Sequence, residues 1–137
     1  MTAANDFPIC GQNFAAGRQA FAQNTTGTWC ISIGNYAGAH TVRATACVVL
    51  GDHVDLPTDS DHVLRYRTKT GKVIERRLDR ITPEIGRMII GEAERVMATF
   101  EYPLGYPEES IRTEGDRFRN FDWQGFFDEW NRNCGRQ

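Results

Sequence analysis

The sequence predicts an α+β fold: a small antiparallel four-stranded β-meander packed by one long amphipathic helix, with an N-terminal helix and an aromatic C-terminal helix. Three observations predict it. Branched apolar runs alternate with turn residues between positions 28 and 78, a capped helical pattern begins at Thr82, and aromatic residues cluster near the C-terminus. With 137 residues, 40% of them apolar, the chain is long enough for one core, so we expect a single domain over residues 1–137 without internal repeats.

The first predicted element is a helix over residues 12–23. Phe14, Phe21 and Ala22 lie at helical spacing, together with the aliphatic stem of Arg18. Gly17 weakens this helix, since glycine loses more backbone freedom on folding than other residues. A turn-forming stretch at residues 24–27 ends it.

The four predicted strands fall in two pairs. Residues 28–33 and 41–50 are rich in apolar and branched side chains, and the glycine-containing stretch 34–38 is expected to join them as a hairpin. Residues 63–68 and 72–78 form the second pair, with Gly71 at the tight connection that is typical of a hairpin. Together they predict a meander.

The strongest local signal is the helix over residues 82–100. Thr82 is a good N-cap, Pro83 suits the first helical position, and Glu84 complements the positive end of the helix. Residues 108–120 are polar and are expected to hold a short turn or helix. Asp122 is expected to cap the last helix, whose aromatic residues share one face: Trp123, Phe126, Phe127 and Trp130.

The charge of the chain is uneven. The formal net charge is −2, yet residues 65–80 contain seven basic and two acidic residues, a local net of +5. This basic hairpin could contact an acidic protein surface or a phosphate backbone, or it could pair with acidic residues of the same chain. The acidic pI, about 5.9, argues against a dedicated nucleic-acid binder.

These features favour a small protein-binding module, for example an inhibitor or an accessory subunit, that contacts an acidic partner through the hairpin at residues 65–80. A nucleic-acid-binding protein that uses the same hairpin is the alternative. The aromatic helix could either close the core or anchor a partner, including a second copy of the chain. The predicted partner-binding residues are Arg65, Tyr66, Arg67, Lys69, Lys72, Arg76, Arg77, Trp123, Phe127 and Trp130.

A second alternative is a metal-dependent enzyme that uses the loop at residues 52–62. Imidazoles and carboxylates are zinc and iron ligands, although loops are also rich in Asp because it stabilises turns. No nucleophile elbow, phosphate-binding loop or dinucleotide motif is present, so we predict no catalytic residue and no cofactor. The candidate ligands are His40, Asp52, His53, Asp55, Asp59, Asp61 and His62.

The expected location is the cytoplasm, because the first twenty residues lack a basic region followed by an apolar one. No apolar run approaches the length of a membrane span, so no membrane contact is expected. The cysteines, Cys10, Cys30, Cys47 and Cys134, form no CxxC pair and are expected to be reduced thiols. Two disulfides remain possible for an exported chain.

Overall fold

A computed structural model describes residues 13–18, 20, 29–39, 43–56, 59–99, 101–102 and 104–136. None of the helices in these residues combines the length and the apolar character that crossing a membrane requires. The elements are β1 (Phe14–Ala16), β2 (Ile31–Ile33), β3 (Ala44–Thr45), β4 (Val48–Leu50), β5 (Ser60–Asp61), β6 (Val63–Arg67), β7 (Val73–Arg77), α1 (Pro83–Thr99), α2 (Glu108–Arg119) and α3 (Trp123–Cys134).

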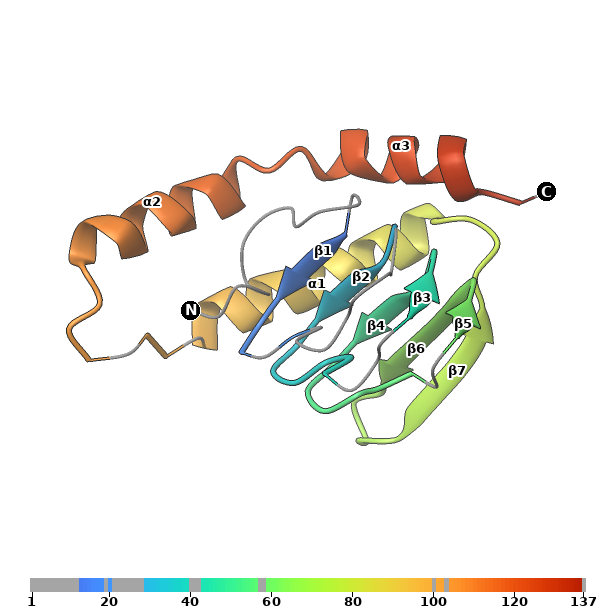
Figure 1. The fold of residues 1–137 in the computed structure, drawn as a ribbon, viewed down its shortest axis with the longest axis horizontal. Helices are drawn as coiled ribbons and strands as arrows, with labels where there is room; N and C mark the ends of the chain where they lie inside the picture. The colour runs from blue at the N-terminus through green and yellow to red at the C-terminus, as the bar shows by residue number, and fades with distance from the viewer. Residues whose placement is uncertain are drawn as a thin grey trace.

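The main sheet has the strand order β1-β2-β4-β6-β7 (Figure 1). Its first four strands are parallel, and Phe14 pairs with Ile31, which pairs with Val48, at a constant step of 17 residues. In a second, two-stranded sheet β3 and β5 are also parallel. The chain therefore winds in successive coils that stack strand on strand, as in a short parallel β-solenoid.

The predicted antiparallel meander is wrong. Residues 34–38 carry the chain around a corner of the coil instead of reversing it, so β2 and β4 run parallel. Both strands are buried at every position, as expected for parallel strands covered on both faces. Of the two predicted hairpins, only the one formed by β6 and β7 is confirmed.

The predicted N-terminal helix is also wrong over the part that can be described. Residues 14–16 form the parallel strand β1, with all three side chains buried. The tertiary setting of a coil overrides the weak helical spacing of a segment that contains Gly17. Positions 12, 19 and 21–23 of the predicted helix lie outside the described residues.

A glycine recurs at the same corner of each coil, which overturns the expectation that the sequence has no repeat. Gly17, Gly34 and Gly51 have φ angles of +120°, +135° and +121°. A Cβ atom on Gly34 would lie 2.6 Å from the carbonyl carbon and oxygen of Gly51. Only glycine fits this corner, because it tolerates the φ angle and allows the close approach of the next coil.

The residue after each glycine links one coil to the next. The Asn35 side-chain oxygen accepts a hydrogen bond from the Arg18 backbone N–H at 2.9 Å. The Asp52 carboxylate accepts one from the Asn35 backbone N–H at 2.8 Å. A ladder of side chain to backbone bonds therefore runs along this corner and ends at Asp52.

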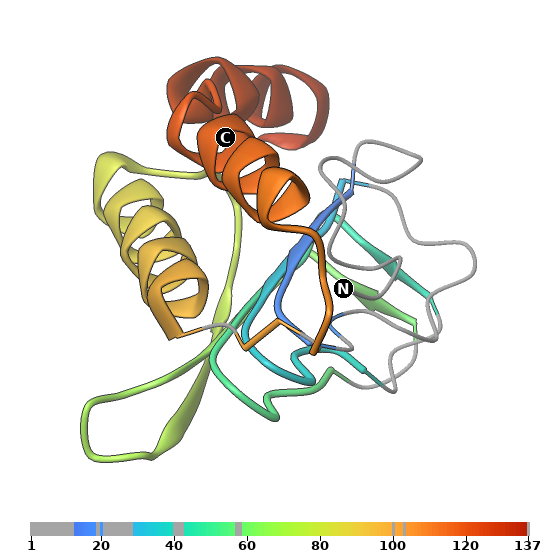
Figure 2. The same cartoon turned by 90° about the vertical axis from the view of Figure 1, so that its left-hand side faces the viewer.

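Two clusters of apolar residues lie on opposite sides of the main sheet. Figure 2 shows α1 on one side of the sheet and β3 and β5 on the other. Large residues such as Ile31, Val48 and Leu64 face the helices, with Trp130 also in that cluster. The interior of the coils holds mostly small residues: Ala15, Ala20, Cys30, Ala37, Ala44, Cys47, Val49, Val54 and Leu56.

The helices follow the local signals of the sequence. The Thr82 hydroxyl accepts a hydrogen bond from the Ile85 N–H at 3.2 Å, and the Asp122 carboxylate accepts one from the Gly125 N–H at 3.0 Å, which confirms both predicted caps. The polar stretch before Asp122 is the 12-residue helix α2. The Trp130 ring N–H donates to the Trp29 carbonyl at 2.7 Å and so ties α3 to the coils.

Candidate functional site

The basic hairpin emerges from the last coil, where β6 leaves the solenoid and β7 returns beside it. A loop that includes Gly71, with φ +89°, joins the two strands. The Thr68 N–H donates to the Lys72 carbonyl at 2.8 Å, and at the other end of the pair the Leu78 N–H donates to the His62 carbonyl at 2.9 Å. Hydrogen bonds at both ends hold the hairpin in one register.

Arg67 closes the open end of the corner ladder. In the earlier coils the Arg18 carbonyl accepts from the Tyr36 N–H, and the Asn35 carbonyl accepts from the His53 N–H. No further coil follows the corner at Asp52. The Arg67 guanidinium instead donates to the Asp52 carbonyl at 3.0 Å, so a side chain replaces the missing backbone donor.

Arg65 has a similar role on the neighbouring turn. One of its guanidinium nitrogens donates to the Asp55 carbonyl at 2.6 Å. Another forms an ion pair with Glu75, which lies opposite Arg65 on β7. Both arginines on β6 therefore donate hydrogen bonds to backbone carbonyls of the same chain, at the end of the solenoid.

The other hairpin cations differ from these two. Arg77 pairs with Asp79 at 2.8 Å. In the part of the chain that the structure describes, the side chains of Lys69, Lys72, Arg76 and Arg80 have no ion pair and no hydrogen bond. The sequence does not distinguish the seven cations. In the structure, three of them bond to groups of the same chain, and four have no such partner in the described residues.

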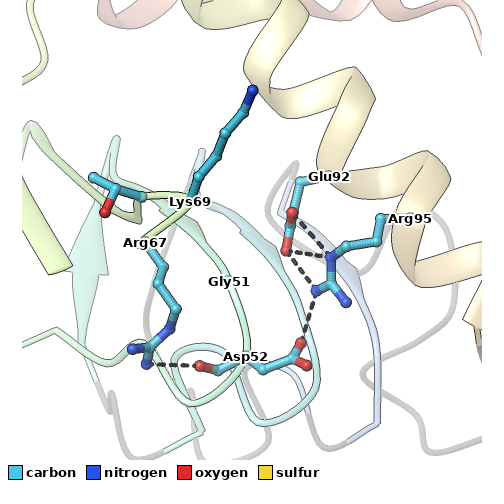
Figure 3. Close-up of a pocket in the computed structure, with 7 residues that line it drawn as sticks. Gly51, Asp52, Arg67, Lys69, Glu92 and Arg95 are labelled. Carbon is cyan, nitrogen blue, oxygen red and sulfur yellow. Dashed lines mark hydrogen bonds and ion pairs between the residues drawn. The ribbon is translucent and has the colours of Figure 1, made fainter. Parts of the chain in front are cut away.

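A cavity of about 390 Å³ lies between the hairpin loop, the corner after β4 and α1 (Figure 3). Lys69 extends from the loop on the side of α1, and Arg67 reaches back to the corner. The charged side chains that line the cavity are three cations and two carboxylates, so the cavity carries a formal charge of +1. The lining residues are Gly51, Asp52, Arg67, Thr68, Lys69, Glu92 and Arg95.

Arg95 bridges the two carboxylates of this cavity. It lies 2.8 Å from Asp52 and 2.6 Å from Glu92. Partial burial would raise the pKa of Asp52, but the hydrogen bonds from Arg95 and from the Asn35 amide outweigh burial and hold the pKa below its usual value. The hydrogen bond to Glu92 raises the pKa of Arg95, and the hydrogen bond to Asp52 acts in the same direction. Burial acts in the opposite direction and is outweighed. Among the three cations of the cavity, Lys69 is the one whose side chain has no acceptor in the described residues.

The predicted aromatic site residues are mostly internal. Trp130 is fully buried and Phe127 is 5% exposed, which leaves these two rings little surface for a partner. Trp123 is half-buried, and its ring centroid lies 4.9 Å from that of Phe14 in β1. Tyr66 is also half-buried, against the core beneath the helices. The aromatic helix therefore closes the end of the sheet.

The histidines and aspartates of the loop at residues 52–62 do not converge. Within the described part of the chain, no three His, Cys, Asp or Glu side chains are placed so that they could hold a metal ion; His40 lies outside that part. Asp52 pairs with Arg95, His53 stacks on Tyr36 with ring centroids 5.0 Å apart, Asp59 pairs with Arg43, and His62 contacts Asp61 and the Cys134 carbonyl.

Three cysteines lie in the described residues, and all three are free thiols. Cys30 and Cys47 are buried in adjacent coils. The hydrogen bond between them raises the pKa of Cys30, as burial also does, and lowers the pKa of Cys47. Burial raises the pKa of Cys134.

Sequence reasoning missed the residues that complete this site from other elements. The sequence places Asp52 among the candidate metal ligands, and Glu92 and Arg95 are not among the predicted site residues. The signal that could have placed Asp52 is the 17-residue spacing of Gly17, Gly34 and Gly51. Comparison with known proteins adds no relative: no protein-family model, no curated protein and no solved structure matches the chain.

Proposed function

We propose that the protein is a protein-binding module that contacts an acidic surface of its partner through Lys69, Lys72 and Arg76. The observation that carries the proposal is the division among the hairpin cations. Arg65 and Arg67 are engaged within the fold, whereas these three side chains have no acceptor in the described residues. Unpaired cations that project from one hairpin steer an acidic partner and set its orientation.

The cavity beside Lys69 supports the same proposal. A carboxylate of the partner would meet Lys69 there, next to the uncompensated charge of Arg67, whose described acceptors are the neutral carbonyls of Asp52 and Gly71. A charge-assisted hydrogen bond is about twice as strong as a neutral one. The simplest role for such a module is that of an inhibitor or accessory subunit that occupies the surface of a larger protein.

A protein partner is favoured over nucleic acid by the charge of the whole chain. In the described residues the hairpin has four cations without an acceptor, and the chain that contains it has a net charge of −2. Nucleic-acid-binding domains usually present a broad basic face, because each phosphate contact contributes through counterion release.

The test compares two triple variants by their affinity for poly-L-glutamate, measured by titration calorimetry. The hairpin variant is Lys69→Glu, Lys72→Glu and Arg76→Glu. The control variant, Arg87→Glu, Arg112→Glu and Arg132→Glu, changes the net charge by the same amount at three exposed helix positions. We expect the hairpin variant to lose binding and the control to retain most of it.

Equal losses in both variants would show that binding follows net charge only and would contradict the proposal. A duplex DNA probe supplies the second comparison. Tighter binding to DNA than to poly-L-glutamate, with a steep dependence on salt and the same sensitivity to the hairpin variant, would favour the nucleic-acid alternative.

A further inference from the structure

The outer edge of β7 is one of the two edges of the main sheet, since β7 is the last strand in its order, and no strand in the described residues pairs with it. Hydrogen-bonded and non-bonded residue pairs alternate along an antiparallel ladder. The bonds at Thr68–Lys72 and His62–Leu78 fix this alternation at both ends. The backbone groups of Ile74 and Arg76 therefore face β6, and those of positions 73, 75 and 77 face away from the sheet.

The side chains of β7 also divide into two sets. Val73, Glu75 and Arg77 share one face, on which Glu75 pairs with Arg65 and Arg77 pairs with Asp79. The charges of that face are already compensated.

The opposite face carries the unpaired charge. The alternation places Lys72, Ile74 and Arg76 on it, with the half-buried Ile74 between two cations that have no acceptor in the described residues. The face thus presents a cation, an apolar side chain and a second cation at every other position. The complementary strand would present an acid, an apolar residue and an acid with the same spacing.

We propose that β7 accepts an extended acidic segment of the partner protein as an additional strand. This inference rests on the proposed function and names how the partner is held. Backbone groups at positions 73, 75 and 77 pair with the segment, and its alternate acidic, apolar and acidic side chains lie beside Lys72, Ile74 and Arg76. Main-chain bonds supply affinity in strand addition, and alternate side chains supply specificity.

The charges of the edge select against other occupants. Charged side chains on an edge strand discourage pairing with neutral strands, because each new neighbour leaves a charge uncompensated. A second copy of β7 would bring Lys72 and Arg76 close to the same two cations of the other copy. Like charges that face each other across strands are unfavourable. An acidic strand is the occupant that these side chains favour.

The test uses a blocked synthetic peptide in which Glu, Val and Glu occupy alternate positions and Thr occupies the positions between them. Two further peptides carry N-methyl groups, one on the Thr amides and one on the Glu and Val amides. In antiparallel addition the Thr amides bond to β7, and in parallel addition the Glu and Val amides do. The affinity of each peptide for the full chain is measured by fluorescence anisotropy.

The expected result is that one methylated peptide loses binding while the other binds like the parent. Failure of the parent peptide to bind, or equal binding of all three peptides, overturns strand addition. If all three peptides bind the parent protein equally and none binds the Lys69, Lys72 and Arg76 charge-reversal variant, strand addition is overturned and the proposed function is not. Failure of that variant to change any affinity would overturn the proposed function as well.

A matched pair of variants at one position tests the same edge from the protein side. Glu75→Pro removes an N–H that faces away from β6, and Glu75→Thr keeps this N–H while removing the same ion pair with Arg65. We expect Glu75→Pro to bind the parent peptide about tenfold more weakly than Glu75→Thr does. Equal affinities of the two variants, with circular dichroism spectra like that of the parent protein, overturn the inference.

Discussion

The coils and the helices of this chain are stabilised over different distances in the sequence. In the coils, Gly34 packs against the backbone of Gly51, 17 residues away, and side chains at the same corner bond the preceding coil. The helices α1 and α3 are capped by Thr82 and Asp122, three residues from the amides they accept. The coils therefore depend on close approach in register, and the helices depend on local caps and on burying large side chains.

The largest expected effect breaks the register of the coils. In Gly34→Ala the new methyl group would lie 2.6 Å from the Gly51 backbone at a φ of +135°, so we expect a loss of more than about 4 kcal/mol or failure to fold. Gly71→Ala is the control, since nothing lies within 4 Å of its Cβ position and only the φ of +89° is unfavourable, at about 1–2 kcal/mol. Urea unfolding measures both, and similar losses would argue against register as the source of coil stability.

The next effect removes the largest buried side chain of the helical layer. Trp130→Ala is expected to lower the free energy of unfolding by about 3–5 kcal/mol, because the ring is fully buried and donates a hydrogen bond to Trp29. Trp130→Phe keeps much of the packing and should cost clearly less. If Trp130→Ala is no more harmful than Trp130→Phe, then packing of α3 contributes little to the fold.

A smaller effect tests the local caps. Asp122→Ala removes the acceptor for the Gly125 amide and is expected to destabilise the protein by about 1 kcal/mol. Asp128→Ala, on the exposed face of α3, serves as the control and should stay within about 0.5 kcal/mol of the parent. Thermal unfolding of the two variants measures the difference, and equal midpoints would count against the cap.

The smallest expected effect concerns pH. The folded pKa of Asp52 is lowered, so the stabilisation that this carboxylate contributes is present at neutral pH and is lost as the pH falls through the lowered pKa. The stabilisation by this ion pair is less than about 1 kcal/mol, because the Asp52 and Arg95 side chains are 40% and 42% exposed. The difference in unfolding free energy between the parent and Asp52→Asn should shrink on acidification. A difference that grows instead would reverse the assigned sign.

The same contrast in range explains what the sequence could predict. The caps at Thr82 and Asp122 and the tight turn at Gly71 are local signals, and they gave α1, α3 and the β6–β7 hairpin correctly. The coils were missed because their signal is the spacing between distant residues such as Gly34 and Gly51.

The candidate site was predicted only in part for a related reason. The basic hairpin and its residues could be read from composition. The roles of Arg65 and Arg67 could not, since the carbonyls they satisfy are open only once the coils have stacked. Charge in a sequence shows how many cations a hairpin has and gives no information on which of them the fold uses.

The hairpin cations divide into a structural and an available group, and one paired measurement tests this division. The affinity for poly-L-glutamate and the free energy of unfolding are measured for Lys72→Glu with Arg76→Glu, and for Arg65→Met with Arg67→Met. We predict that the first variant loses affinity at unchanged stability, and that the second loses about 1–3 kcal/mol of stability while still binding. The opposite pattern, with affinity lost only on changing Arg65 and Arg67, would contradict this division of the cations.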